Sequence, residues 1–160
     1  NRYRFFRWIG AFSVNRSSPW QSLESIHYAV SLFDRPNRAL WIYPQGVMRP
    51  NDARPLGFSS GVGRIARQLG RVQLVPIAHR YEFINEQRPE AFVLVGTPKQ
   101  VESAGDPKRL AQSLELTCTE LADSLRKMIA SGKSDSFSVI LSGKMSTNAA
   151  FDLVRMRGGR

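Results

Sequence analysis

The residues best suited to chemistry in this sequence lie between positions 41 and 50. There an apolar stretch stops at the segment Tyr43-Pro44-Gln45-Gly46, and an arginine, Arg49, follows. A buried strand that ends in a tight polar turn presents backbone N–H groups to a ligand. N–H groups and a guanidinium both bind anions, so this run predicts an anion-binding turn.

The basic residues are concentrated in the first half of the chain. Residues 1–80 hold 12 basic and 3 acidic side chains, whereas residues 81–160 hold 11 and 10. All 12 are arginines, whose planar fork binds phosphate in a bidentate manner. The first half therefore suits phosphate on a lipid, a nucleotide carrier or a nucleic acid. An arginine-rich solvated surface explains most of the 12 equally well, and Arg54 and Arg64 are candidates by charge alone.

The histidines and the cysteine do not form a catalytic or metal-binding set. His27 falls in the middle of an expected helix, and the next acid, Asp34, is seven positions away. His79 follows an expected strand. Both are better explained as packing or surface residues, and Cys118 as a buried structural thiol. We therefore predict no catalytic base among them, no metal and no disulfide.

The pattern of apolar residues predicts helices that alternate with strands. A chain of 160 residues has room for one domain with its own core. The alternation favours an α/β layered domain, and residues 131–160 form a less certain C-terminal extension. No stretch is apolar enough to span a membrane. The expected helices are the start of 5–14, 20–33, 58–70, 107–131 and 147–156, and the expected strands are the end of 5–14, 39–43, 72–78, 91–96 and 137–141.

Four segments together resemble one family. They are Gly10-x-x-Ser13-Val14-x-Arg16, Tyr43-Pro44-Gln45-Gly46, Phe58-Ser59-Ser60-Gly61 and Val75-Pro76-Ile77. In this order and at these separations they resemble the glycerolipid acyltransferases, the family that includes 1-acylglycerol-3-phosphate acyltransferase. That family has a Gly-x-x-Phe-Ile-x-Arg block, a Phe-Pro-Glu-Gly-Thr-Arg block, a Phe-Lys-x-Gly segment before a helix and a hydrophobic strand with a central proline. The resemblance covers about residues 5 to 130.

The resemblance implies a fold and a reaction. The fold is an α/β layered domain with a mixed central sheet flanked by helices, and residues 1–160 are a single, partial domain. The reaction transfers an acyl group to a hydroxyl of a lysophospholipid such as 1-acylglycerol-3-phosphate, in phospholipid biosynthesis. Acyl-CoA or acyl carrier protein is the co-substrate, and there is no cofactor.

The resemblance also implies where the catalytic residues lie. The family uses a His-x4-Asp motif, in which the histidine is the base and the aspartate orients it, before the first block. This chain begins at Asn1, nine residues before Gly10, and no such motif precedes the first block. We therefore expect the catalytic motif upstream of Asn1, the N-terminal part of the domain to be missing, and the fragment to be inactive alone.

The same resemblance assigns five substrate-binding residues. Arg16 matches the family's arginine for the acceptor phosphate, and Pro44, Gln45 and Gly46 match the second block. Gln45 replaces the usual glutamate, and a neutral amide cannot act as a general base, although it still binds hydroxyls. Arg49 stands one place later than the family's arginine and is the fifth residue.

Other interpretations stay open at this point. Gln45 also suits a glycosylated lipid or carotenoid acceptor, and a non-catalytic lipid-binding relative fits the same motifs. The resemblance implies a peripheral location on the cytoplasmic face of a membrane. The aromatic side chains of Phe5, Phe6 and Trp8 suit the interface of such a membrane. Alternatively, these side chains pack against the missing N-terminal part of the domain. The pI of about 10.6 is compatible with nucleic-acid binding. Because the aromatics lie in apolar runs and no nucleic-acid motif is present, we do not expect a nucleic-acid partner.

Overall fold

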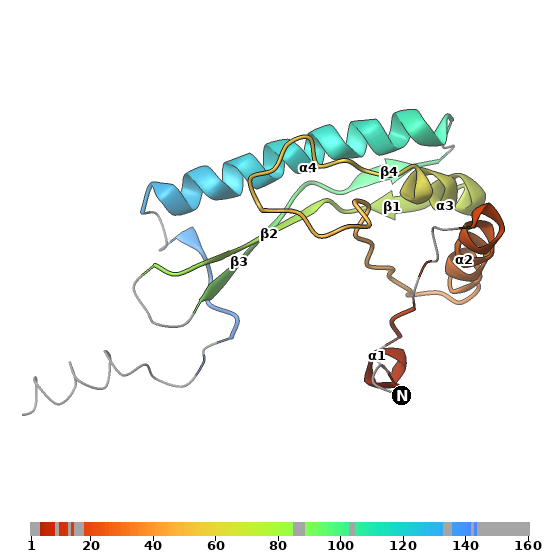
Figure 1. Ribbon diagram of the computed structural model, residues 1–160, viewed down its shortest axis with the longest axis horizontal. Helices are drawn as coiled ribbons and strands as arrows, with labels where there is room; N and C mark the ends of the chain where they lie inside the picture. The colour runs from red at the N-terminus through yellow and green to blue at the C-terminus, as the bar shows by residue number, and fades with distance from the viewer. Residues whose placement is uncertain are drawn as a thin grey trace, which may run out of the picture. The chain divides into compact units, whose positions relative to one another are not determined.

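The computed structural model describes residues 4–8, 10–12, 14, 18–84, 89–102, 105–132, 136–141 and 143. The described residues divide into two compact units. Unit 1 takes the residues up to Pro50, 54–74 and 99–115, and unit 2 takes 51–53, 75–98 and the residues from 116 on. The elements are α1 (Arg4–Trp8), α2 (Pro19–Ser31), α3 (Gly61–Leu69), β1 (Val72–Leu74), β2 (Ile77–Glu82), β3 (Glu90–Val95), β4 (Lys99–Val101) and α4 (Pro107–Ala130) (Figure 1).

Glycines end the two shortest helices. At the end of α1, Gly10 has a φ of 81°, and the N–H of Ala11 donates to the carbonyl of Phe6. At the end of α3, Gly70 has a φ of 72° and donates its N–H to the carbonyl of Ala66. A positive φ, which glycine adopts at little cost, takes the chain out of the helix at both points. The predicted helix end at Gly70 is therefore confirmed.

The two longer helices begin at a proline, whose fixed φ suits the first helical position. Pro19 opens α2, and Pro107 opens α4. The carboxylate of Asp106 accepts the N–H of Lys108 at 3.0 Å and so caps α4. These bounds confirm the helices expected at 20–33 and 107–131. Among the helices in the described part of the chain, none is both long and apolar enough to cross a bilayer.

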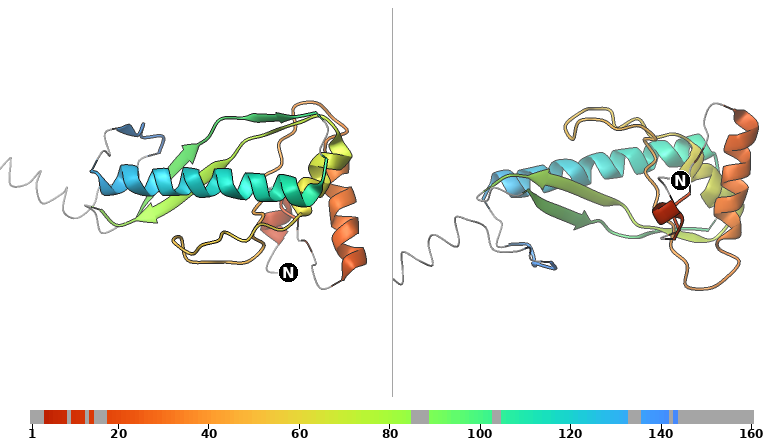
Figure 2. Two further views of the ribbon diagram at one scale, coloured as in Figure 1. Left: turned by 90° about the horizontal axis from the view of Figure 1, so that it is seen from above. Right: turned by 60° about the horizontal axis from the view of Figure 1, so that its bottom comes forward.

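Unit 1 is built from helices and one pair of strands. In it α2 lies beside α3, as both views of Figure 2 show. Strand β1 pairs with β4 in antiparallel fashion, with Val72 opposite Val101. Gly63 lies so close to α4 that an added Cβ would overlap the carbonyl oxygen of Pro107. The core comprises Val62, Ala66, Val101, Ala111 and Leu114, with Ile42, Phe58, Val72, Leu74 and Leu110 packed around it.

Unit 2 is a two-stranded sheet packed on a helix. Strand β2 pairs with β3 in antiparallel fashion, with Ile77 opposite Val95. Ala78 and Phe92 are buried together with Leu125, which lies in the part of α4 that belongs to this unit. One face of the sheet is thus covered by a helix, as a layered α/β arrangement requires.

The strand expected at 39–43 is wrong. Residues 38–43 belong to no strand, and only Ile42 among the apolar side chains from 41 to 43 packs on the core. Trp41 and Tyr43 are exposed. A strand exists only through hydrogen bonds to a neighbour, and in the described residues the pairs are β1 with β4 and β2 with β3. An apolar, β-favouring run was therefore not sufficient to make a strand.

The strand expected at 72–78 is split at Val75-Pro76, because Pro76 has no N–H to donate. Its second part, β2, runs on to Glu82, so His79 lies within a strand. β3 confirms the strand expected at 91–96, whereas β4 was not expected.

The described residues are mixed α and β, as expected. Their sheets, however, are two antiparallel pairs of strands, so the predicted mixed central sheet is not confirmed. No strand forms in the described residues of 11–14 or 137–141, and the helix expected at 147–156 lies outside the described residues.

The close approach at Gly63 can be tested with Gly63→Ala. A Cβ there would lie 2.8 Å from the carbonyl carbon of Pro107, which is backbone and cannot rotate away. Overlap of this kind costs about 1–3 kcal/mol or more and exceeds the roughly 1 kcal/mol that alanine gains over glycine in a helix. We expect the free energy of unfolding in urea to fall by about 2 kcal/mol.

The matched control is Gly105→Ala, because a Cβ at Gly105 would meet no atom within 4 Å. This variant should unfold within about 1 kcal/mol of the wild type. Equal stabilities for the two variants would contradict the tight packing of α3 on α4.

Candidate functional site

The predicted turn is present at residues 43–46. The N–H of Gly46 donates to the carbonyl of Tyr43 at 3.2 Å, and Gly46 has a φ of 63°. Positive φ is costly for residues with a Cβ, so the turn depends on glycine at this position. The carbonyl of Pro44 accepts the N–H of Ser59 at 2.9 Å. This bond joins the turn to the segment that leads into α3.

Arg49 folds back toward the end of the same loop. Its Nη1 donates to the carbonyl of Pro55 at 3.2 Å. The guanidinium also lies over Gly57, where an added Cβ would meet Nη2 at 3.2 Å. Arg49 is exposed to solvent, so its guanidinium is accessible to an anion. A guanidinium in such a position can bind a phosphate through paired hydrogen bonds.

Glu115 on α4 binds the backbone of this loop. Its Oε1 accepts the N–H of Gly57 at 2.6 Å, and its Oε2 accepts the N–H of Phe58 at 3.1 Å. The sequence analysis did not single out this residue. The sequence contained only a weak indication of this role. Glu115 directly follows Leu114, a core residue of α4, so its carboxylate lies at the edge of the buried face of the helix.

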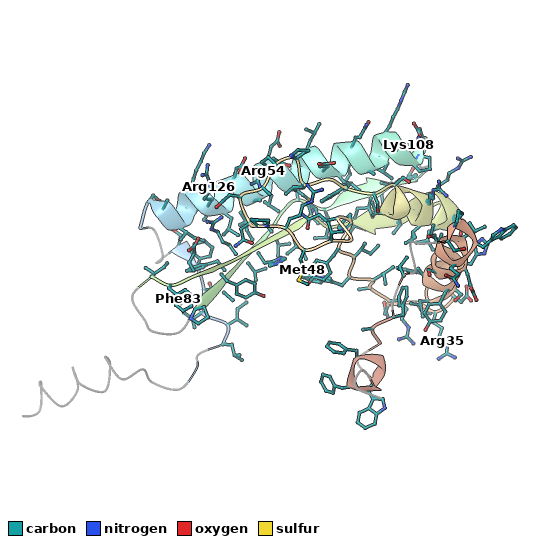
Figure 3. All side chains as sticks on the ribbon, viewed as in Figure 1. Arg35, Met48, Arg54, Phe83, Lys108 and Arg126 are labelled. Atoms are coloured by element: carbon teal, nitrogen blue, oxygen red, sulfur yellow. The ribbon has the colours of Figure 1, made fainter. Side chains whose placement is uncertain are left out.

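The loop also exposes large apolar side chains. The exposed residues include Trp41, Tyr43, Val47 and Met48, and Met48 is fully exposed. Figure 3 labels Met48 on this loop. The sequence from Arg35 to Asn51 contains no acidic residue. The loop surface therefore combines apolar side chains with positive charge.

The structure brings together some of the predicted site residues. Pro44, Gln45 and Gly46 share one turn, and Arg49 lies against Gly57 in the same unit. Arg16 lies outside the described residues, so its role stays a prediction. The two candidates chosen by charge alone, Arg54 in the loop and Arg64 on α3, are both exposed.

The two histidines are exposed, which agrees with the surface alternative expected for His27, whereas the structural role expected for His79 stays a prediction. His27 is exposed on α2. His79 is exposed on β2, with its ring centroid 5.9 Å from that of Tyr81. Within the described ranges no three potential metal-ligating side chains gather at one place.

The catalytic motif expected upstream of Asn1 is not tested by the structure. Asn1 itself lies outside the described residues, which begin at Arg4. The position of the His-x4-Asp motif, and with it the inactivity of residues 1–160 alone, therefore stays a prediction.

Arg80 in unit 2 is held by two acids. Its Nη1 and Nη2 bind the carboxylate of Asp52 at 2.8 and 3.3 Å, and its Nε binds Glu82. The hydrogen bonds, first to Asp52 and then to Glu82, raise the pKa of Arg80 above its ordinary value. This arginine is therefore committed to an internal ion-pair network and is a poor candidate for binding an external phosphate.

These features define a mixed α/β protein with an exposed arginine beside a glycine-dependent turn. Residues 3–80 match a family model described as Acyltransferase. The matched part is just under half of the chain and contains all four motif segments, and it supports an acyltransferase family and acyl transfer in general. The comparison with curated proteins found no match, and neither did the comparison with solved structures.

Cys118 offers a test of the structural interpretation of its thiol. Burial raises the pKa of this half-buried thiol above its ordinary value. Because the thiolate is the reactive form, a raised pKa leaves less of it near neutral pH. We expect iodoacetamide at pH 7.5 to alkylate Cys118 at least about fivefold more slowly than free glutathione, and the rate to rise with pH.

Unfolding in urea should remove this protection and restore the rate of an ordinary thiol. A native rate at or above that of glutathione would show that Cys118 is an activated thiol and would overturn the structural interpretation.

Proposed function

We propose that this chain belongs to an enzyme that transfers an acyl group from acyl-CoA or acyl carrier protein to a hydroxyl of a lysophospholipid. The proposed acceptor is 1-acylglycerol-3-phosphate, and the proposed role is in phospholipid biosynthesis. The observation that carries the proposal is the family match over residues 3–80, because it contains the Tyr43–Gly46 turn and Arg49. The proximity of Arg49 to Gly57, within the same unit as the turn, supports a shared binding role.

In the proposed reaction the acceptor hydroxyl oxygen attacks the thioester carbonyl carbon. A new C–O bond forms, the C–S bond breaks, and the proton of the hydroxyl passes through a base to the leaving thiol. Arg49 and Arg16 would bind the phosphate, and Gln45 would bind a hydroxyl of the acceptor. The base is proposed to be the histidine of a His-x4-Asp motif upstream of Asn1, not His27 or His79.

The exposed apolar side chains support the proposed peripheral location at a membrane, whose cytoplasmic face is proposed from the family resemblance alone. Phe5, Phe6 and Trp8 on α1 are exposed, as are Trp41 and Met48 on the loop. Aromatic and apolar side chains next to arginines suit the interface of an anionic bilayer, where rings enter the headgroup region and guanidinium groups stay with the phosphates. A lipid acceptor would reach the loop from that surface.

The acceptor can be identified with the full-length protein. Lysophosphatidate and a glycosylated monoacyl lipid are offered separately with the same acyl-CoA, and release of free CoA is measured. We expect turnover of lysophosphatidate to be preferred, because two arginines are proposed for its phosphate. Gln45 favours the glycosylated lipid as a second candidate, since an amide binds sugar hydroxyls. Turnover of the glycosylated lipid alone would overturn the lysophospholipid assignment.

The role of Arg49 can be tested with Arg49→Gln. If its guanidinium binds the acceptor phosphate, the substitution removes a charge-assisted hydrogen bond worth about 1.5–3 kcal/mol. We expect the KM for lysophosphatidate to rise by about tenfold or more, with the KM for acyl-CoA little changed.

Arg67→Gln is the matched control, because Arg67 is an exposed arginine on α3. Its KM values should stay within about twofold of the wild type, as expected for a surface substitution. A similar rise in both variants would indicate a general effect of charge and no specific phosphate contact.

A further inference from the structure

One side chain outside residues 3–80 binds the loop of the proposed acceptor site. This is Glu115, whose carboxylate accepts the N–H groups of Gly57 and Phe58. We infer that Glu115 is a positioning residue, which holds Arg49 and the Tyr43–Gly46 turn in the geometry that receives the acceptor phosphate. The inference rests on the proposed function, because it concerns the same site.

The carboxylate binds two consecutive N–H groups, one with each oxygen. Both bonds are part-buried, with N–O distances of 2.6 and 3.1 Å. Hydrogen bonds to a carboxylate are stronger than those between neutral groups, and breaking them leaves part-buried N–H groups without a partner. Glu115 therefore fixes the backbone at Gly57 and Phe58 against α4.

From Gly57 the constraint passes to Arg49. The guanidinium packs against Gly57, with its atoms 3.2 to 3.5 Å from the position that a Cβ of Gly57 would take. Its Nη1 also donates to the carbonyl of Pro55, two residues before Gly57. A loop backbone that is fixed at residues 55–57 gives the guanidinium a defined position.

From Phe58 the constraint passes to the turn. Phe58 packs on the core cluster of Val62, Ala111 and Leu114, and the next N–H, that of Ser59, donates to the carbonyl of Pro44. One carboxylate thus holds two parts of the site, the cation and the turn. Since the N–H groups of residues 57 and 58 both donate to Glu115, the phosphate in this arrangement is left to the arginines and not to these amides.

The test compares Glu115→Ala and Glu115→Gln with Glu120→Gln, which changes an exposed acid on the same helix. The first readout is hydrogen exchange of individual amides in the full-length protein. We expect Glu115→Ala to speed exchange at Gly57 and Phe58 by about tenfold or more, because their acceptor is lost. Glu115→Gln keeps one acceptor oxygen and should give an intermediate effect, and Glu120→Gln should give none.

The second readout is the dissociation constant of a short-chain lysophosphatidate, compared with that of the monoacylglycerol that lacks the phosphate. Glu115→Ala should weaken the phosphate-bearing ligand by about fivefold or more and leave the other within about twofold. In an Arg49→Gln background the same substitution should have little further effect on the preference for the phosphate-bearing ligand over the monoacylglycerol, because the phosphate-dependent part of Glu115's effect passes through Arg49.

Equal weakening of both ligands, additive effects of the two substitutions, or unchanged exchange at Gly57 and Phe58 would each overturn the inference. The proposed function fails separately. If the wild type binds lysophosphatidate but does not acylate it, the enzyme assignment is wrong, whereas the binding and exchange results still decide the role of Glu115. If the wild type binds no phosphate-bearing ligand, the inference is overturned as well.

Discussion

The contact between Gly63 and the carbonyl of Pro107 is the constraint on which unit 1 depends. At this point α3 and the start of α4 approach so closely that no Cβ fits between them. The approach lets small core residues such as Ala66 and Ala111 be almost fully buried. It also places the start of α4 against α3, and Glu115 follows Pro107 by eight residues, about 12 Å along the helix. The packing of α3 on the start of α4 therefore helps to place the carboxylate of Glu115 at Gly57 and Phe58.

The loop between Ile42 and Phe58 has no sheet partner, so its backbone groups need other acceptors and donors. Within the turn, the N–H of Gly46 donates a hydrogen bond to the carbonyl of Tyr43, and the N–H of Ser59 donates another to the carbonyl of Pro44. Glu115 provides two more. These bonds hold the backbone in place, while Tyr43, Val47 and Met48 stay exposed to solvent. A rigid backbone with exposed side chains is the usual arrangement of a binding loop.

The sequence predicted the helices well, because their signals are local. A proline at the first position and a glycine after the last one, such as Gly70, mark helix ends within a few residues. Strands were predicted less well, since an apolar run such as 39–43 does not reveal whether a partner strand exists. The turn at Gly46 was predictable for the same local reason as the helix ends. Glu115 was not, because its hydrogen-bond partners lie 57 and 58 positions away.

The shifted arginine of the second motif has a physical counterpart in the loop. In the glycerolipid acyltransferase pattern the arginine would stand at position 48, and here that position holds Met48, which is fully exposed. Arg49, one residue later, instead lies over Gly57, with its Nη2 3.2 Å from the position that a Cβ would take. A Cβ at position 57 would press on that guanidinium at 3.2 Å and would also strain a backbone with a φ of 76°. Arg49 and Gly57 are therefore best understood as a pair, in which the guanidinium packs closely on a glycine eight residues further along the loop.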